Sequence, residues 1–136
     1  MEKQNKQSEP SFYVNFEKVY ARNIDSNISL LNFLRHNCKF TGTKEGCSEG
    51  DCGACSVLIF DEKGSLAPVN SCILKVGQIL DKNIVTIEGA SKLSSAKPLI
   101  EALNSKAASQ CGFCTPGFVM AALALKEKHK NPSESV

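Results

Sequence analysis

Three cysteines stand within nine residues in the stretch Cys47-Ser-Glu-Gly-Asp-Cys52-Gly-Ala-Cys55, and another cysteine follows at Cys72. Four glycines between residues 41 and 54 give this stretch a backbone that can turn tightly and approach a bound group closely. Cysteines clustered in this way, without an export signal before them, more often hold metal than form disulfides. The stretch therefore predicts a loop around a metal centre, with Cys72 arriving from another element.

The spacing of the cysteines narrows the kind of metal centre. The pattern C-x4-C-x2-C followed by a distant cysteine is the plant-type spacing of a [2Fe-2S] cluster. A zinc site favours paired C-x2-C arms. A Rieske centre needs two histidines near its cysteines, whereas His36 and His129 lie elsewhere in the sequence. We therefore expect the four cysteines to bind one cluster and the chain to transfer single electrons.

Length and composition are those of an ordinary globular protein. The chain has 136 residues, of which 42% are hydrophobic and 22% charged, with a formal net charge of +2. This charge favours neither nucleic acid nor an anionic membrane as a partner. Residues 1–10 are polar and predict a disordered tail rather than a signal peptide, and the apolar run 118–125 is too short to cross a bilayer. We expect a cytoplasmic protein.

The first part of the chain has the pattern of a small mixed sheet. Ser29 can cap a helix whose apolar stripe begins at Leu30 and whose last turn holds Arg35 and His36. Alternating or β-branched runs indicate strands, of which the first two should pair as a hairpin; these runs are residues 12–16, 19–22, 56–60 and 83–87.

After Gly89 the pattern becomes helical. Residues 98–107 and 116–130 read as helices separated by Gln110-Cys-Gly-Phe-Cys114. Thr115 as N-cap followed by proline is a strong helix start. The second helix is almost wholly apolar in its first half, so this half should be buried, and we expect the two aromatic residues Phe113 and Phe118 to be core residues rather than electron relays.

The two cysteine motifs together resemble one protein family. Residues 42–55, which begin Gly-Thr-Lys-Glu-Gly-Cys, and Ser109-Gln-Cys-Gly-Phe-Cys-Thr-Pro-Gly117 resemble the iron–sulfur part of the molybdenum hydroxylases. The resemblance is strongest to xanthine dehydrogenase and covers nearly everything after the tail. It extends through Leu30-Leu-Asn-Phe-Leu-Arg35, Val69-Asn-Ser-Cys72 and Thr86-Ile-Glu-Gly89.

The resemblance implies an α+β fold in two parts. Residues 11–89 would form a plant-type ferredoxin-like β-grasp domain, and residues 90–136 the first helices of a four-helix iron–sulfur bundle. Relatives complete a second cluster with a later C-x-C motif, which these residues lack, so we expect the bundle to be truncated and the second cluster incomplete. Relatives also often turn the first hairpin on Asn-Gly. Here Phe16 follows Asn15, which disfavours a tight type I′ turn.

The resemblance also implies roles for single residues. The four cysteines of the first motif would bind the cluster nearer the flavin, and Gln110 would contact the pterin cofactor, although it could equally be an ordinary loop residue. Cys38 lies outside every motif and is most simply a small core residue. Cys111 and Cys114 would supply half of the ligands of a cluster nearer the molybdenum, with buried structural cysteines as the alternative.

The expected function follows from these roles. The chain would be the electron-transfer part of a xanthine dehydrogenase-like oxidoreductase, with no catalytic residue of its own. It would pass electrons from a molybdenum centre to FAD. The implied partners are FAD-binding and molybdopterin-binding subunits or domains. Two alternatives stay open, namely a free-standing ferredoxin-like one-electron carrier and an inactive fragment of such an enzyme.

Overall fold

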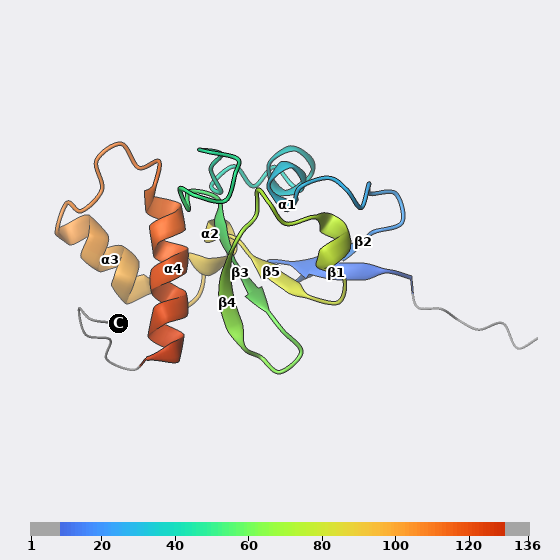
Figure 1. Cartoon of the computed structure of the whole chain (residues 1–136). Helices are drawn as coiled ribbons and strands as arrows, with labels where there is room; N and C mark the ends of the chain where they lie inside the picture. The colour runs from blue at the N-terminus through green and yellow to red at the C-terminus, as the bar shows by residue number, and fades with distance from the viewer. Residues whose placement is uncertain (1–8, 130–136) are drawn as a thin grey trace, which may run out of the picture.

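A five-stranded sheet is the centre of the computed structural model, which describes residues 9–129 (Figure 1). Its strand order is β2-β1-β5-β3-β4, with β1 and β5 parallel and the other pairs antiparallel. The mixed α+β class expected from the sequence is confirmed. The strands are β1 (Ser11–Val14), β2 (Glu17–Tyr20), β3 (Ser56–Phe60), β4 (Leu66–Asn70) and β5 (Asn83–Val85).

Helical segments cover both faces of the sheet. The short helix α1 and the π-helical turn η1 pack on one face, whereas α4 lies across β3 and β4 on the other, with α3 beside it (Figure 1). The helical segments are α1 (Leu30–Asn32), η1 (Phe33–Asn37), the 3₁₀ turn η2 (Val76–Gln78), α2 (Ile87–Ala90), α3 (Lys97–Ser105) and α4 (Thr115–Lys128).

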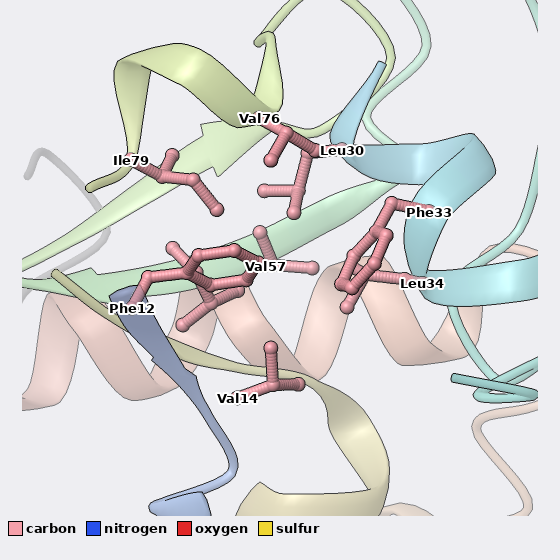
Figure 2. Close-up of a cluster of buried hydrophobic side chains, with 9 residues drawn as sticks. Phe12, Val14, Leu30, Phe33, Leu34, Val57, Val76 and Ile79 are labelled. Atoms are coloured by element: carbon pink, nitrogen blue, oxygen red, sulfur yellow. The ribbon is translucent and has the colours of Figure 1, made fainter. Parts of the chain in front are cut away.

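The first hydrophobic core lies between the sheet and α1–η1. Phe12 from β1 and Val57 from β3 are completely buried against Leu30 and Leu34, as Figure 2 shows. The ring of Phe12 meets that of Phe33 edge to face at a centroid distance of 5.5 Å. Burying a leucine or phenylalanine side chain contributes about 1.5–3 kcal/mol. The predicted apolar stripe is confirmed. The first core therefore holds α1–η1 against the sheet, just ahead of the cysteine-rich loop in the chain.

The second hydrophobic core uses the opposite face of the same strands. Leu58 and Val85 alternate with residues of the first core and pack against Met120 and Leu123 of α4. Helix α4 is therefore seated on the sheet. The prediction that its whole first half is buried is wrong for Phe118, which is 57% exposed because the helical repeat turns it away from the face of Met120 and Leu123. Phe113 is also exposed rather than part of a core.

The first hairpin turns more tightly than the sequence suggested. Val14 pairs with Glu17, and the two residues between them have positive φ, 51° at Asn15 and 71° at Phe16. This is the backbone of a type I′ turn, so the turn forms although Phe16 disfavours it. The side chain of Asn15 holds the turn, because it accepts the N–H of Thr86 at 2.8 Å and donates to its hydroxyl at 3.0 Å.

The ends of several elements differ from the sequence expectations. Ser29 caps α1 as expected, accepting the N–H of Asn32 at 3.1 Å. Helix α4 instead has Cys114 at its N-cap position, and Thr115 is its first residue. Residues 1–8 of the expected tail and the expected helix end at Lys130 lie outside the described residues. No helix within 9–129 is both long and apolar enough to cross a membrane.

Candidate metal centre

The cysteine-rich loop, residues 41–55, leaves η1 and enters β3 at one end of the sheet (Figure 1). Its beginning is held from two sides. Arg35 of η1 donates from Nη1 to the carbonyl oxygens of Thr41 at 3.0 Å and Thr43 at 2.8 Å. The N–H of Gly42 donates to Oε1 of Glu88 at 2.7 Å. The loop therefore starts from a position set by two charged side chains.

The segment Thr86–Gly89, noted in the sequence for its resemblance alone, has a structural role. Oε2 of Glu88 accepts the hydroxyl of Thr86 at 2.7 Å while Oε1 holds the loop. A Cβ at Gly89 would overlap the side-chain amide of Asn15, and a Cβ at Gly42 would overlap Ile87. Glycine is required at both positions because backbone and side chain meet there without room for another atom. The hairpin turn, α2 and the loop are thus tied together.

Cys47 sits in a nest of backbone donors. Its Sγ accepts the N–H groups of Glu49 at 3.4 Å, Asp51 at 3.3 Å and Cys52 at 3.3 Å. The backbone reaches this shape through Gly50, whose φ is 80°. The pKa of the Cys47 thiol is lowered to about 7, above all by the N–H of Cys52 and then by those of Glu49 and Asp51. A thiolate is the form that binds metal, so this donor set prepares Cys47 as a ligand.

The end of β4 and the segment after it also brace the loop. Asn70 donates from Nδ2 to the carbonyl oxygen of Gly50 at 2.8 Å, and the buried hydroxyl of Ser71 donates to that of Cys55 at 2.7 Å. The side chain of Ile73 lies against Gly50, with Cδ1 3.1 Å from the place of a Cβ there. These contacts deliver Cys72, which stands between Ser71 and Ile73, to the loop.

The four thiols of the first motif influence one another's pKa values. Burial raises the pKa of Cys72, and the thiol of Cys55 raises it further; the charge of Cys47 acts in the same direction. The thiol of Cys52 in turn contributes to the lowered pKa of Cys47. Among the cysteines, Cys72 is thus influenced above all by Cys55, and Cys47 by Cys52. All seven cysteines, which fall within residues 9–129, are free thiols, so none is consumed in a disulfide.

The donors of the first motif are all thiols. No three His, Cys, Asp or Glu side chains in the described part of the chain converge tightly enough to surround a single ion. A [2Fe-2S] cluster needs four thiolates, two to each iron. The loop offers Cys47, Cys52 and Cys55 with three N–H donors directed at the sulfur of Cys47, and Cys72 comes from the segment after β4. The donor set therefore suits this cluster chemically.

The second motif is not assembled in the same way. Gln110, Cys111 and Cys114 all lie exposed in the loop between α3 and α4. A hydrogen bond between the hydroxyls of Ser109 and Thr115, at 2.7 Å, spans this loop. Within residues 9–129, no group of three His, Cys, Asp or Glu side chains forms around Cys111 and Cys114.

The remaining cysteine and the two histidines belong to neither cysteine motif. Cys38 packs against the first hydrophobic core, where burial raises its pKa to about 11, in keeping with a small core residue. His36 and His129 are exposed and belong to neither site. Sequence reasoning missed the bracing residues Asn70 and Ser71. Their position immediately before Cys72 was the signal, because polar residues beside a metal ligand often orient it.

The comparisons with known proteins concern the second half of the chain in one case and nearly the whole chain in the others. A family model described as [2Fe-2S] binding domain matches residues 86–136. The chain is 40% identical over 128 residues to aldehyde oxidase 1 of Rattus norvegicus and 39% identical over 128 residues to xanthine dehydrogenase of Emericella nidulans. Each match covers 90% of this chain, and the chain spans about a tenth of the length of these curated relatives.

A solved structure is similar over most of its own length. The quinoline 2-oxidoreductase structure from Pseudomonas putida 86 contains a chain that is 30% identical, with a TM-score of 0.73. The match covers 94% of the present chain and 77% of that chain. The cysteine geometry and these relatives lead to the same assignment. The chain belongs to the iron–sulfur domains and subunits of the molybdenum hydroxylases, the family of xanthine dehydrogenase and aldehyde oxidase.

Proposed function

We propose that the chain transfers electrons as the iron–sulfur part of a xanthine dehydrogenase-like molybdenum hydroxylase. The observation that supports the proposal is the loop of Cys47, Cys52 and Cys55, in which three N–H groups meet the sulfur of Cys47 and whose braces place the segment of Cys72 beside it. A bound [2Fe-2S] cluster supplies reversible one-electron chemistry. Cys47 would hold it as a ready thiolate, and Cys72 would close the site from the segment after β4.

The hydrogen bonds around the loop would tune this electron carrier. Amides that donate to ligand sulfur stabilise added negative charge and thereby raise a cluster's reduction potential. The N–H groups of Glu49, Asp51 and Cys52 are placed to do this at Cys47. The braces from Asn70 and Glu88 would keep the loop in one shape in both oxidation states, since a rigid ligand frame needs little rearrangement when the charge changes.

The fold supports a division that we also propose. Residues 11–89 would be a plant-type ferredoxin-like β-grasp domain, and residues 90–136 the first part of a four-helix bundle. The five-stranded sheet with its cysteine loop supports the first part, and the family match to residues 86–136 supports the second. The contact of α4 with β3 and β4 means that the two parts share the second hydrophobic core.

Cys111 and Cys114 would supply half of the ligands of a second cluster, and Gln110 would contact the pterin. Their exposure at one surface loop suits contact with another segment or subunit. Cys38 is the one cysteine outside both motifs, and it packs in the first core, so it is no source of a missing ligand.

The partners would be FAD-binding and molybdopterin-binding subunits or domains. Electrons would enter from the molybdenum side, near Cys111 and Cys114, and leave toward FAD from the first cysteine loop. The free thiols suit a reducing compartment, and we place the protein in the cytoplasm.

The experiment that tests this proposal mixes the reduced, cluster-loaded chain with a FAD-containing partner expressed from the same source. Reoxidation of the chain should match flavin reduction in stopped-flow absorbance, and affinity capture of the tagged chain should bring flavin and molybdopterin with it. A loaded chain that is always isolated alone, and whose electrons reach only small diffusible acceptors, would replace the proposal with the free-standing carrier.

A further inference from the structure

The second cysteine motif touches the loop of the first at two glycines. Gly117, in the first turn of α4, is buried against the backbone of Gly53 and Ala54. A Cβ at Gly117 would overlap the carbonyl oxygen of Gly53 and lie 3.2 Å from Cα of Ala54. The helix therefore begins in direct backbone contact with the peptide that joins Cys52 to Cys55.

The second contact comes from the aromatic residue between Cys111 and Cys114. A Cβ placed on Gly46 would lie 3.7 Å from Cε1 of Phe113 and 2.7 Å from Sγ of Cys52. The edge of the Phe113 ring and the sulfur of Cys52 thus border the same small space above Gly46. Cys52 is exposed in the chain, so a ring beside its sulfur occupies room that water would otherwise fill.

Phe113 gains little else from this position. It remains 44% exposed and belongs to neither hydrophobic core. Phe118, further along α4, is comparably exposed at 57%, but it has no described contact with the cysteine loop. Phe113 is thus a large, exposed apolar side chain whose ring edge faces the loop of the metal-ligand cysteines. This position suggests a role at that loop.

We propose that the second motif covers the first metal centre, with Phe113 as the shielding residue and Gly117 as the contact that seats it. The inference rests on the proposed cluster at Cys47, Cys52, Cys55 and Cys72. Phe113 limits the access of water, oxygen and chelators to the Cys52 side of that cluster. The role does not require metal at Cys111 and Cys114, so the second motif serves the first site even when it holds no cluster itself.

The test compares Phe113→Ala with Phe118→Ala in the full chain loaded with iron and sulfide under anaerobic conditions. Both variants remove an exposed phenylalanine ring, and circular dichroism checks that both fold. The first readout is the rate of bleaching of visible absorbance after addition of a chelator. Phe113→Ala should bleach about tenfold faster than the unchanged chain, the lower end of what loss of an outer contact costs metal affinity. Phe118→Ala should bleach at the unchanged rate.

The second readout is the midpoint potential of the cluster. Water that reaches the cluster stabilises the reduced, more negative form, so Phe113→Ala should raise the potential while Phe118→Ala leaves it in place. Phe113→Tyr, which keeps the ring, should restore the bleaching rate and the potential. A purely structural role for Phe113 would lower the unfolding temperature without moving the potential, and that result would overturn the inference.

Failure of this inference can be told from failure of the proposed function. If the unchanged chain takes up no iron and sulfide, the metal centre itself is wrong. If it takes them up and Phe113→Ala bleaches and titrates like Phe118→Ala, the metal centre stands and the cover is wrong. Gly117→Ala supplies an independent arm, since moving α4 away from Gly53 should accelerate bleaching in the same direction.

Discussion

The two cysteine loops of this chain differ in how much of their shape the chain itself supplies. In the cysteine-rich loop, residues 41–55, hydrogen bonds arrive from η1, from α2 and from the end of β4, and three N–H groups meet one sulfur. The loop of Cys111 and Cys114 is exposed, with one described side-chain hydrogen bond across it. A preassembled ligand set can bind its metal within the chain, whereas an open pair needs ligands from elsewhere.

The largest effect on cluster uptake should come from replacing a cysteine of the first site, compared with replacing the cysteines of the second motif. Cys72→Ser removes one of the four thiolates of the first site and should abolish uptake of the cluster, because serine is a poor replacement on iron. The double variant Cys111→Ser, Cys114→Ser should take up one cluster like the unchanged chain. Iron and sulfide content after anaerobic reconstitution measures both. Equal loss of iron in the two variants would mean that the loops do not differ as described.

The next effect concerns the braces. Glu88→Ala removes the carboxylate that accepts the N–H of Gly42 and the hydroxyl of Thr86, and should lower the free energy of unfolding by about 1.5–3 kcal/mol. Glu101→Ala, an exposed glutamate of α3, is the matched control and should change it by less than about 0.5 kcal/mol. Denaturant titration of the metal-free chain gives both values, and similar losses would show that the loop is not fastened through Glu88.

The thiols themselves should titrate differently in the metal-free chain. With its pKa lowered to about 7, Cys47 becomes a thiolate as the pH rises through neutrality, whereas Cys38 stays protonated until about pH 11. Alkylation of Cys47 at pH 7 should be about threefold faster than that of an ordinary thiol, after allowing for the lower nucleophilicity of an acidic thiolate. Mass-spectrometric mapping across pH 5–9 measures this; a Cys47 rate that rises only above pH 8.5 would remove the role of the N–H donors.

The smallest effect is expected at the first hairpin, which the cysteine loop reaches indirectly, through Thr86 and α2. Phe16→Gly relieves a positive φ at a bulky residue and should stabilise the chain by about 0.5–1 kcal/mol. Phe16→Ala removes the same ring and its contact with Phe60, whose centroid lies 6.3 Å away, but keeps the strain and should not stabilise. The unfolding temperatures of the two variants separate the effect of backbone strain from the effect of losing the ring's packing.

The sequence was informative where a local pattern carries the structure. The residue patterns predicted β1, β2, β3 and β5 to within a few residues but missed β4, and Ser29 predicted the cap of α1. The cysteine spacing pointed to a loop in which three N–H groups do meet the sulfur of Cys47. In each case the physical cause lies among near neighbours in the chain, or in the coordination number of the metal.

The sequence was misleading where a distant contact overrides a local preference. The Asn15–Phe16 turn is held by Thr86, 71 residues further along, and no local rule contains that bond. The exposure of Phe118 follows from which face α4 presents to the sheet, which cannot be read from an almost wholly apolar segment. Two other contacts depend on the assembled fold in the same way. Glu88 accepts a hydrogen bond from Gly42, and the Phe113 ring lies beside Gly46.

One measurement tests the central claim most directly: the EPR spectrum of the full chain after anaerobic loading with iron and sulfide and reduction by dithionite. If the thiols at 47, 52, 55 and 72 together hold a two-iron centre, the spectrum shows the signal of one reduced [2Fe-2S] cluster per chain. That signal should disappear in Cys72→Ser and persist in Cys38→Ser. A loaded chain that is colourless and silent by EPR, or a signal that survives Cys72→Ser unchanged, would contradict the account.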